Sequence, residues 1–453
     1  MRFRRALTLG LALLLSASMW YYFRAVLIPY QVKESVLHKT PRGNLSDLYP
    51  RWLGTRELLL HGQDPYSSEV TREIQIGYYG EALDGSQPNS PRDEQRFAYP
   101  AYVVFLLAPT ITMPFPMLRP VFRVLLILMT AASVPLWMRA LGLRFERTTT
   151  AAIALLTLGS FPVIEALYLE QLSLLVFFLI AASCAAVAGE RHVPAGILLA
   201  LATIKPQIAA AIVAWFGLWA LGDWARRKRF VSAFAWSMAV LWLGAEWILP
   251  GWFGRWWAAM HAYLGYTDVR SLLETLLGKY PGLLASALVG AGVALSCWRS
   301  RRAPAGSSAF NASLLSVLAA SLLVKPKFPF YDLGILLPAA LWLFQCRKAL
   351  WQRSRAVRNL FFTASYLLGW QWFAAVALAA ISLVSPSVAQ HGWNLPVAAM
   401  FLLPVGLSCL LGVLAVDAWR GSALSQGAAG LPTVKPEETS ALTPVAANGG
   451  FGQ

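Results

Sequence analysis

Polar side chains outside the basic clusters of this chain are few, and they recur in short motifs between long apolar runs. An acid surrounded by cations close to a membrane is suited to general-base chemistry beside a phosphate-bearing lipid. The residues that could do such chemistry are Asp47 in SDLYPRW, Asp64 and Tyr66 in HGQDPY, Glu165, Glu170 and Gln171 in EQLS, Lys205 in TIKPQ, and Lys325, Lys327, Tyr331 and Asp332 in KPKFPFYD.

The composition predicts the kind of scaffold that must position these residues. The chain has 453 residues, of which 57% are hydrophobic and 13% are charged, whereas soluble domains carry about 25% charged residues. Apolar runs near the length of a membrane span recur up to about residue 420. We therefore predict an all-α polytopic membrane protein of about 11–13 transmembrane helices. This composition excludes three classes as the main interpretation of the chain: a DNA-binding domain, a secreted disulfide scaffold and a cytosolic enzyme.

The basic residues predict the orientation of the chain in the membrane. The net charge is +16, but the Lys and Arg residues form short clusters between apolar runs, as in cytoplasmic loops. The clusters are RFRR at 2–5, Arg139/Arg144/Arg147, ARRKR at 225–229, RSRR at 299–302 and the basic stretch 347–358. We therefore expect membrane lipids and no nucleic acid as partners, with the N-terminus and the tail 421–453 in the cytoplasm.

The apolar runs divide the chain into one membrane domain, 1–420, and a disordered tail, 421–453, which is rich in Ala, Gly, Ser, Thr and Pro. Residues 6–23 can be a cleaved signal peptide, but the aromatic run at 20–23 favours an uncleaved first helix. Segment 30–97 is then the first outer loop. Segment 98–118 is expected to lie at the outer face, and the Trp-rich stretch 250–281 to form an outer interfacial helix.

Lys205 lies in the middle of an apolar run and directly precedes Pro206. Proline interrupts a helix, so residues 194–221 are expected to form two half-helices that meet at Lys205. Broken helices in membranes usually line a cavity.

Each polar motif also has a structural interpretation. Asp47 can be a loop acid or the N-cap of the following helix, and HGQDPY can be a turn with Gly62 as the C-cap. Glu170 and Gln171 can form a tight hairpin turn, and Lys325 and Lys327 can contact lipid headgroups. His261 and Asp268 in the Trp-rich stretch are expected to be interfacial.

Five motifs in a fixed order carry a family resemblance. They are D.Y.RW with LL.HGQDPY, FAYPAYVVFLLAP, EQLSLLVFFLIAAS, AGILLALATIKPQ and KPKFPFYDLGILLP, over residues 45–340. With these motifs in this order, the chain resembles glycosyltransferase family 87. The resemblance implies a GT-C fold and transfer of mannose from polyprenol-phosphate-mannose to a lipid-linked or glycan acceptor. It also implies an active site on the outer, periplasmic face of the plasma (inner) membrane.

The resemblance assigns roles to the motif residues. It implies that Asp47 is the general base, and we expect the donor phosphate to be bound by Arg51, Lys205, Lys325 and Lys327. The residues expected to contact the sugar or the acceptor are Gln171, Glu170, Tyr331, Asp332, Asp64 and Tyr66. Two positions depart from the family pattern: lysines stand near 325 where members carry serine or histidine, and YPA at 99–101 replaces YPP.

A lipid-linked donor already carries its phosphate leaving group, so no nucleotide site or cofactor is required, and no P-loop is visible. We expect metal to be dispensable. Two other functions remain open. A polysaccharide polymerase or ligase would need its long outer loop late in the chain, and a transporter or flippase would show paired halves and charges throughout the bundle interior.

Overall fold

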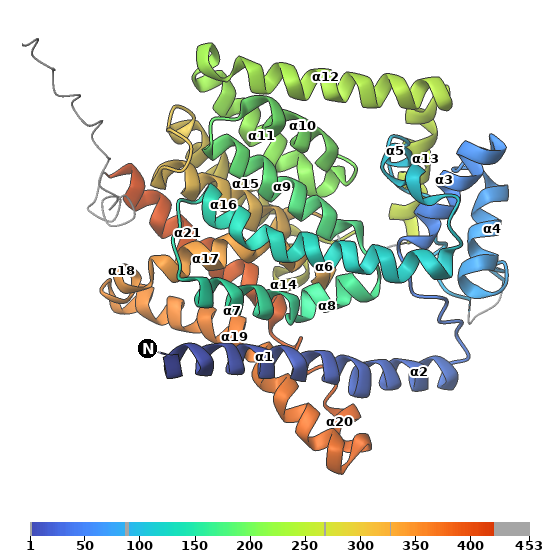
Figure 1. Ribbon diagram of the computed structural model, residues 1–453, viewed down its shortest axis with the longest axis horizontal. Helices are drawn as coiled ribbons and strands as arrows, with labels where there is room; N and C mark the ends of the chain where they lie inside the picture. The colour runs from blue at the N-terminus through green and yellow to red at the C-terminus, as the bar shows by residue number, and fades with distance from the viewer. Residues whose placement is uncertain (1, 87–89, 267–268, 327, 421–453) are drawn as a thin grey trace, which may run out of the picture.

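The computed structural model describes residues 2–86, 90–266, 269–326 and 328–420. Within these residues the chain is helical and has no β-strand (Figure 1). The first half contains α1 (Arg2–Tyr22), the π-helical turn η1 (Phe23–Leu27), α2 (Ile28–Leu37), α3 (Tyr49–His61), α4 (Ser68–Tyr79), α5 (Val103–Leu107), η2 (Ala108–Thr110), α6 (Phe115–Ala140), α7 (Arg147–Leu158), α8 (Phe161–Tyr168), α9 (Leu172–Ala188), α10 (His192–Ala202) and α11 (Pro206–Gly222). The second half contains α12 (Trp224–Ile248), α13 (Trp252–Tyr266), α14 (Leu272–Leu277), α15 (Lys279–Ser300), α16 (Ser308–Val324), η3 (Phe330–Leu336), α17 (Leu337–Gln345), α18 (Arg347–Trp351), α19 (Arg355–Val384), α20 (Pro386–His391), η4 (Met400–Leu402) and α21 (Leu403–Trp419).

The prediction of an all-α, multi-pass membrane protein is confirmed. Six helices of the described residues are long and apolar enough to cross a membrane, and the pair α7–α8, bent by 56°, gives a possible seventh span. Five further apolar helices have 10–17 residues: α9, α10, α11, α16 and η3–α17. The expected number of 11–13 spans is therefore not reached by full-length helices in the described residues. The break at Lys205 divides one apolar run into the two shorter helices α10 and α11.

The first helix is longer than expected. Instead of ending near residue 23, it continues through η1 into α2 and reaches Leu37. Pro29 is the second residue of α2, one residue past the π-helical turn, where a widened backbone tolerates a residue that has no N–H donor. Segment 30–97, predicted to be the first outer loop, therefore begins with helix.

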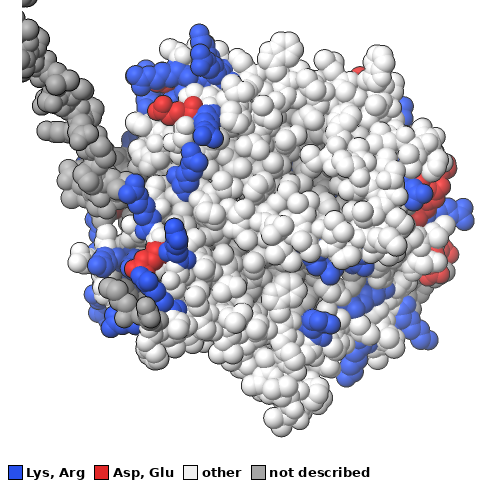
Figure 2. Space-filling view, viewed as in Figure 1, with Lys and Arg blue, Asp and Glu red and all other residues white. Residues whose placement is uncertain are grey.

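The two ends of the helix bundle differ in charge. The N-terminus and the end of α21 lie at the left of Figure 1, and α3, α4, α5 and α13 gather at the right. Figure 2 shows mostly basic side chains at the left end, a broad uncharged band in the middle, and acidic and basic side chains together at the right end. This is the arrangement expected of a protein whose middle band faces lipid.

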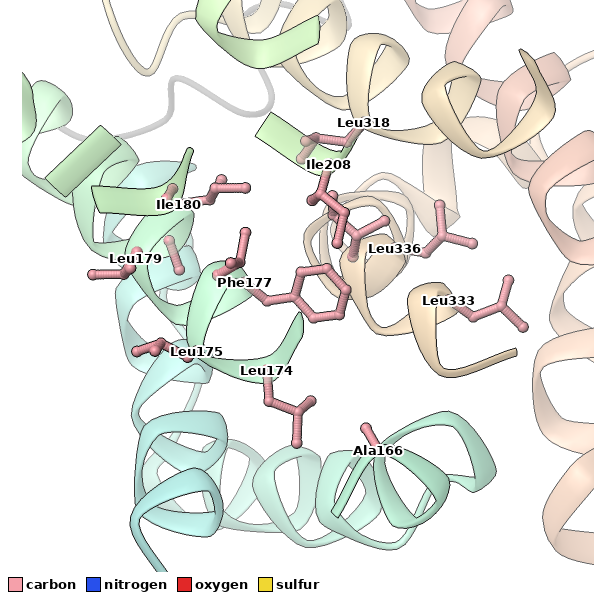
Figure 3. Close-up of a cluster of buried hydrophobic side chains, with 14 of the residues drawn as sticks. Ala166, Leu174, Leu175, Phe177, Leu179, Ile180, Ile208, Leu318, Leu333 and Leu336 are labelled. Carbon is pink, nitrogen blue, oxygen red and sulfur yellow. The ribbon is translucent and has the colours of Figure 1, made fainter. Parts of the chain in front are cut away.

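An apolar cluster joins the helices that carry the polar motifs (Figure 3). Phe177 of α9 points between α8, α9, α11 and η3, and its ring lies 3.0 Å from the position that a Cβ on Gly334 would occupy. Leu174, Ile208 and Leu333 belong to the same cluster. They lie within three residues of Ser173, Lys205 and Asp332, so this packing fixes the relative positions of those polar side chains.

Candidate active site

Asp47 lies between α2 and α3, and its side chain does not cap α3. The N-cap of α3 is Leu48, with no side-chain cap bond. The backbone N–H of Asp47 donates to the carbonyl of Leu169 (2.8 Å), and its carboxylate accepts from the Gln171 amide. Arg51, one helical turn later, donates to the Asp47 carbonyl (2.9 Å). The Asp47 carboxylate and N–H therefore contact the α8–α9 turn, and only its carbonyl contacts α3.

The surroundings of Asp47 shift its pKa upward. Burial is the largest cause, and it outweighs the lowering effects of Arg51, Lys205 and the Gln171 hydrogen bond. A carboxylate with a raised pKa is a stronger proton acceptor than an exposed aspartate, as a general base requires.

Lys205 lies at the break between α10 and α11, as the sequence predicted. Its side chain is buried, with 5% of the residue exposed. The Nζ atom donates to Gln171 Oε1 (2.9 Å) and to Ser173 Oγ (2.5 Å), and it lies 5.2 Å from the centroid of the Tyr331 ring. A buried ammonium needs such partners, because desolvating it without them is costly.

Asp332 and Lys325 complete the polar network on the far side of Lys205. Ser173 donates its hydroxyl to Asp332 Oδ1 (3.2 Å), and Lys325 forms an ion pair with the other oxygen of Asp332. A continuous path of side-chain contacts thus runs from Asp47 through Gln171, Lys205, Ser173 and Asp332 to Lys325. It joins segments that lie far apart in the sequence.

Other expected site residues lie outside this network. Asp64 forms an ion pair with Arg255 of α13 (2.7 Å) and accepts from the backbone N–H of Tyr66 (2.9 Å), and the Tyr66 hydroxyl donates to the Tyr99 carbonyl (2.6 Å). Gly62 caps α3 at φ +67°, so the turn predicted for HGQDPY is present. These contacts join the segment after α3 to α13 and to the segment before α5. Lys327 lies outside the described residues.

Glu170 faces away from its neighbour Gln171. Its side chain is fully buried and forms ion pairs with Arg119 and Arg123 of α6, neither of which the sequence motifs singled out. Ser173 was also missed, although it lies two residues after Gln171 in the same EQLS motif. Its hydroxyl bridges Lys205 and Asp332, a role that a small polar residue at the start of an apolar helix could have suggested.

No group of three or more His, Cys, Asp or Glu side chains within the described ranges is placed to hold a metal ion. The four cysteines, Cys184, Cys297, Cys346 and Cys409, are free.

Comparison with known proteins identifies the family. The model of glycosyltransferase family 87 matches residues 97–326, a range that contains Gln171, Ser173, Lys205 and Lys325. No curated protein and no solved structure matches the chain. The matched residues make up just over half of the sequence and include the core of the polar network. The chain therefore belongs to glycosyltransferase family 87 and is a multi-pass membrane glycosyltransferase.

Proposed function

We propose that this glycosyltransferase transfers a hexose, expected to be mannose, from a polyprenyl-phosphate-linked donor to a lipid-linked or glycan acceptor. The transfer inverts the anomeric carbon and uses Asp47 as the general base. It takes place on the outer face of the plasma membrane.

The proposal depends on the Gln171 amide, which is hydrogen-bonded both to the proposed base, Asp47, and to a cation, Lys205. Its nitrogen donates to Asp47 and its oxygen accepts from Lys205, so a single rigid group sets the spacing between carboxylate and ammonium. Inverting glycosyl transfer from a phosphate needs a base on one side of the anomeric carbon and positive charge near the leaving group on the other. The two side chains are the pair that such a reaction requires.

In the proposed reaction, Asp47 removes the proton of the acceptor hydroxyl as that oxygen attacks the anomeric carbon. The bond from the anomeric carbon to the phosphate oxygen breaks, and the phosphate leaves with the bonding electrons. Lys205 would stabilise the resulting charge, supported by Lys325 and by Arg51. Polyprenyl phosphate and the glycosylated acceptor are the products.

The position of the network supports the proposed location. Asp47 and Arg51 lie with α3 and α4 at the end of the bundle opposite the basic N-terminus. Under the positive-inside rule that end is the outer one. The network also lies beside apolar helices, where a lipid-anchored donor could present its phosphate.

The test uses the full-length protein in nanodiscs with radiolabelled polyprenyl-phosphate-mannose and an extract of acceptor glycolipids from the source membranes. We expect label to move into acceptor with inverted anomeric configuration, also in the presence of EDTA. Polyprenyl-phosphate-glucose in a parallel reaction tests the sugar. Movement of intact donor across the bilayer without transfer would contradict the proposal and support a flippase.

A further inference from the structure

The turn between α8 and α9 carries a buried carboxylate, paired with two partly exposed arginines, directly beside the residue that contacts Asp47. Glu170 has 0% side-chain exposure, and its carboxylate is held by Arg119 (Nη2 to Oε2, 3.2 Å) and by Arg123. The two arginines lie one turn apart on α6, so both guanidinium groups reach the same carboxylate. Arg123 also donates from Nε to the Leu167 carbonyl (3.2 Å).

The backbone at this turn has a conformation that the cluster can stabilise. Glu170 has φ +49°, in the left-handed region that residues with a side chain rarely adopt. The residues on both sides of Glu170 contact Asp47: the Leu169 carbonyl accepts from its N–H, and the Gln171 amide donates to its carboxylate. Glu170 therefore turns its own side chain toward α6 while Gln171 turns toward Asp47.

We propose that Arg119, Glu170 and Arg123 form a positioning clamp that aims the Gln171 amide at Asp47 and Lys205. The inference rests on the proposed function, since it takes Asp47 as the base. The clamp residues do not touch the reacting groups. They act through the turn, because a buried carboxylate held at two points cannot move without losing its charged partners.

The clamp is tested with Glu170→Gln, which keeps the size of the side chain and removes its charge. We expect kcat to fall about ten- to a hundredfold, because small misplacements in an active site have effects of this size. The KM for the donor should stay unchanged. The same substitution made in a Gln171→Ala background should change kcat by less than about threefold, because the group that the clamp positions is already gone.

An equal loss in both backgrounds would overturn the proposal, since it would show a general structural effect. Arg119→Gln is the second variant in case Glu170→Gln folds poorly, because Arg123 still pairs with the buried carboxylate. It should show a smaller loss with the same dependence on Gln171. Asp417→Asn is the matched control: Asp417 is also a buried acid, paired with a partly exposed arginine, Arg353 (2.6 Å), and its loss should leave kcat unchanged.

These outcomes are distinct from failure of the proposed function. If the Asp47→Asn variant were fully active, the base would lie elsewhere, whatever the Glu170 variants show. If that variant is inactive and Glu170→Gln is additive with Gln171→Ala, only the clamp is wrong.

Discussion

Two buried cations, Lys205 and Arg227, lie in different parts of the molecule and are held in different ways. Arg227 of α12 is 6% exposed and Lys205 is 5% exposed. Arg227 donates to three backbone carbonyls, those of Trp219 (2.5 Å), Arg301 (2.8 Å) and Ala303 (3.1 Å), and its guanidinium lies 3.9 Å from the Trp219 ring centroid. Lys205 instead donates to the side chains of Gln171 and Ser173.

The difference separates a structural cation from one that can bind a ligand. Backbone carbonyls at the ends of helices cannot leave without unfolding the turn, so Arg227 joins α11, α12 and the 301–303 turn permanently. Side-chain partners can rotate, so the proposed donor phosphate could replace a neutral amide or hydroxyl as a stronger partner of Lys205.

We expect the largest difference between the Lys205 region and the Arg227 region to be the side of the membrane on which each one lies. In a variant without native cysteines, Cys placed at Ser90 should react with an impermeant maleimide in intact cells. Cys placed at Lys228, beside Arg227, should react only after permeabilisation. The opposite pattern would put both the network and its donor on the inner face.

Asp47→Asn removes the proposed base but keeps the size of the side chain. We expect turnover to fall about 10²–10⁴-fold, or roughly 3–5 kcal/mol of barrier, with donor binding retained. Single-turnover assays with Asp64→Asn and Asp332→Asn as companions check this. A larger loss at Asp332 with intact donor binding would assign the base to η3.

Lys205→Met and Arg227→Met compare the two cations directly. Lys205→Met should raise the donor KM about 10–100-fold, because a charge-assisted hydrogen bond contributes roughly 1.5–3 kcal/mol. Arg227→Met should lower the thermal midpoint and leave the donor KM unchanged. If Lys205→Met affects only the midpoint, both cations are structural.

The smallest expected effect is on the pH profile. A base must be deprotonated, so kcat/KM falls as the pH drops through the pKa of Asp47, which burial raises above its ordinary value of 3.8. Arg51 lowers this pKa, so Arg51→Met should move the acid limb to higher pH. An unchanged acid limb in Arg51→Met would mean that another group controls it.

Local features of the sequence were enough to predict several elements. The break at Lys205-Pro206 follows from the missing N–H of proline, and the end of α3 follows from Gly62, which adopts a positive φ without a steric penalty. The apolar runs predicted an all-helical membrane protein, and the end of the first helix was misplaced because a π-helical turn leaves no clear sequence signal. Both predicted elements depend on residues a few positions apart.

The polar network around Lys205 depends on tertiary structure. Gln171 meets Asp47 across 124 residues, and Ser173 meets Asp332 across 159. Glu170 and Gln171, adjacent in the sequence and expected to act together, point to different partners because the backbone at Glu170 is left-handed. The sequence therefore determined which polar residues the membrane domain contains and where its helices break. Only the packing of α6, α8, α9, α11 and η3 decided which of these residues meet, because that depends on helix orientation rather than on spacing along the chain.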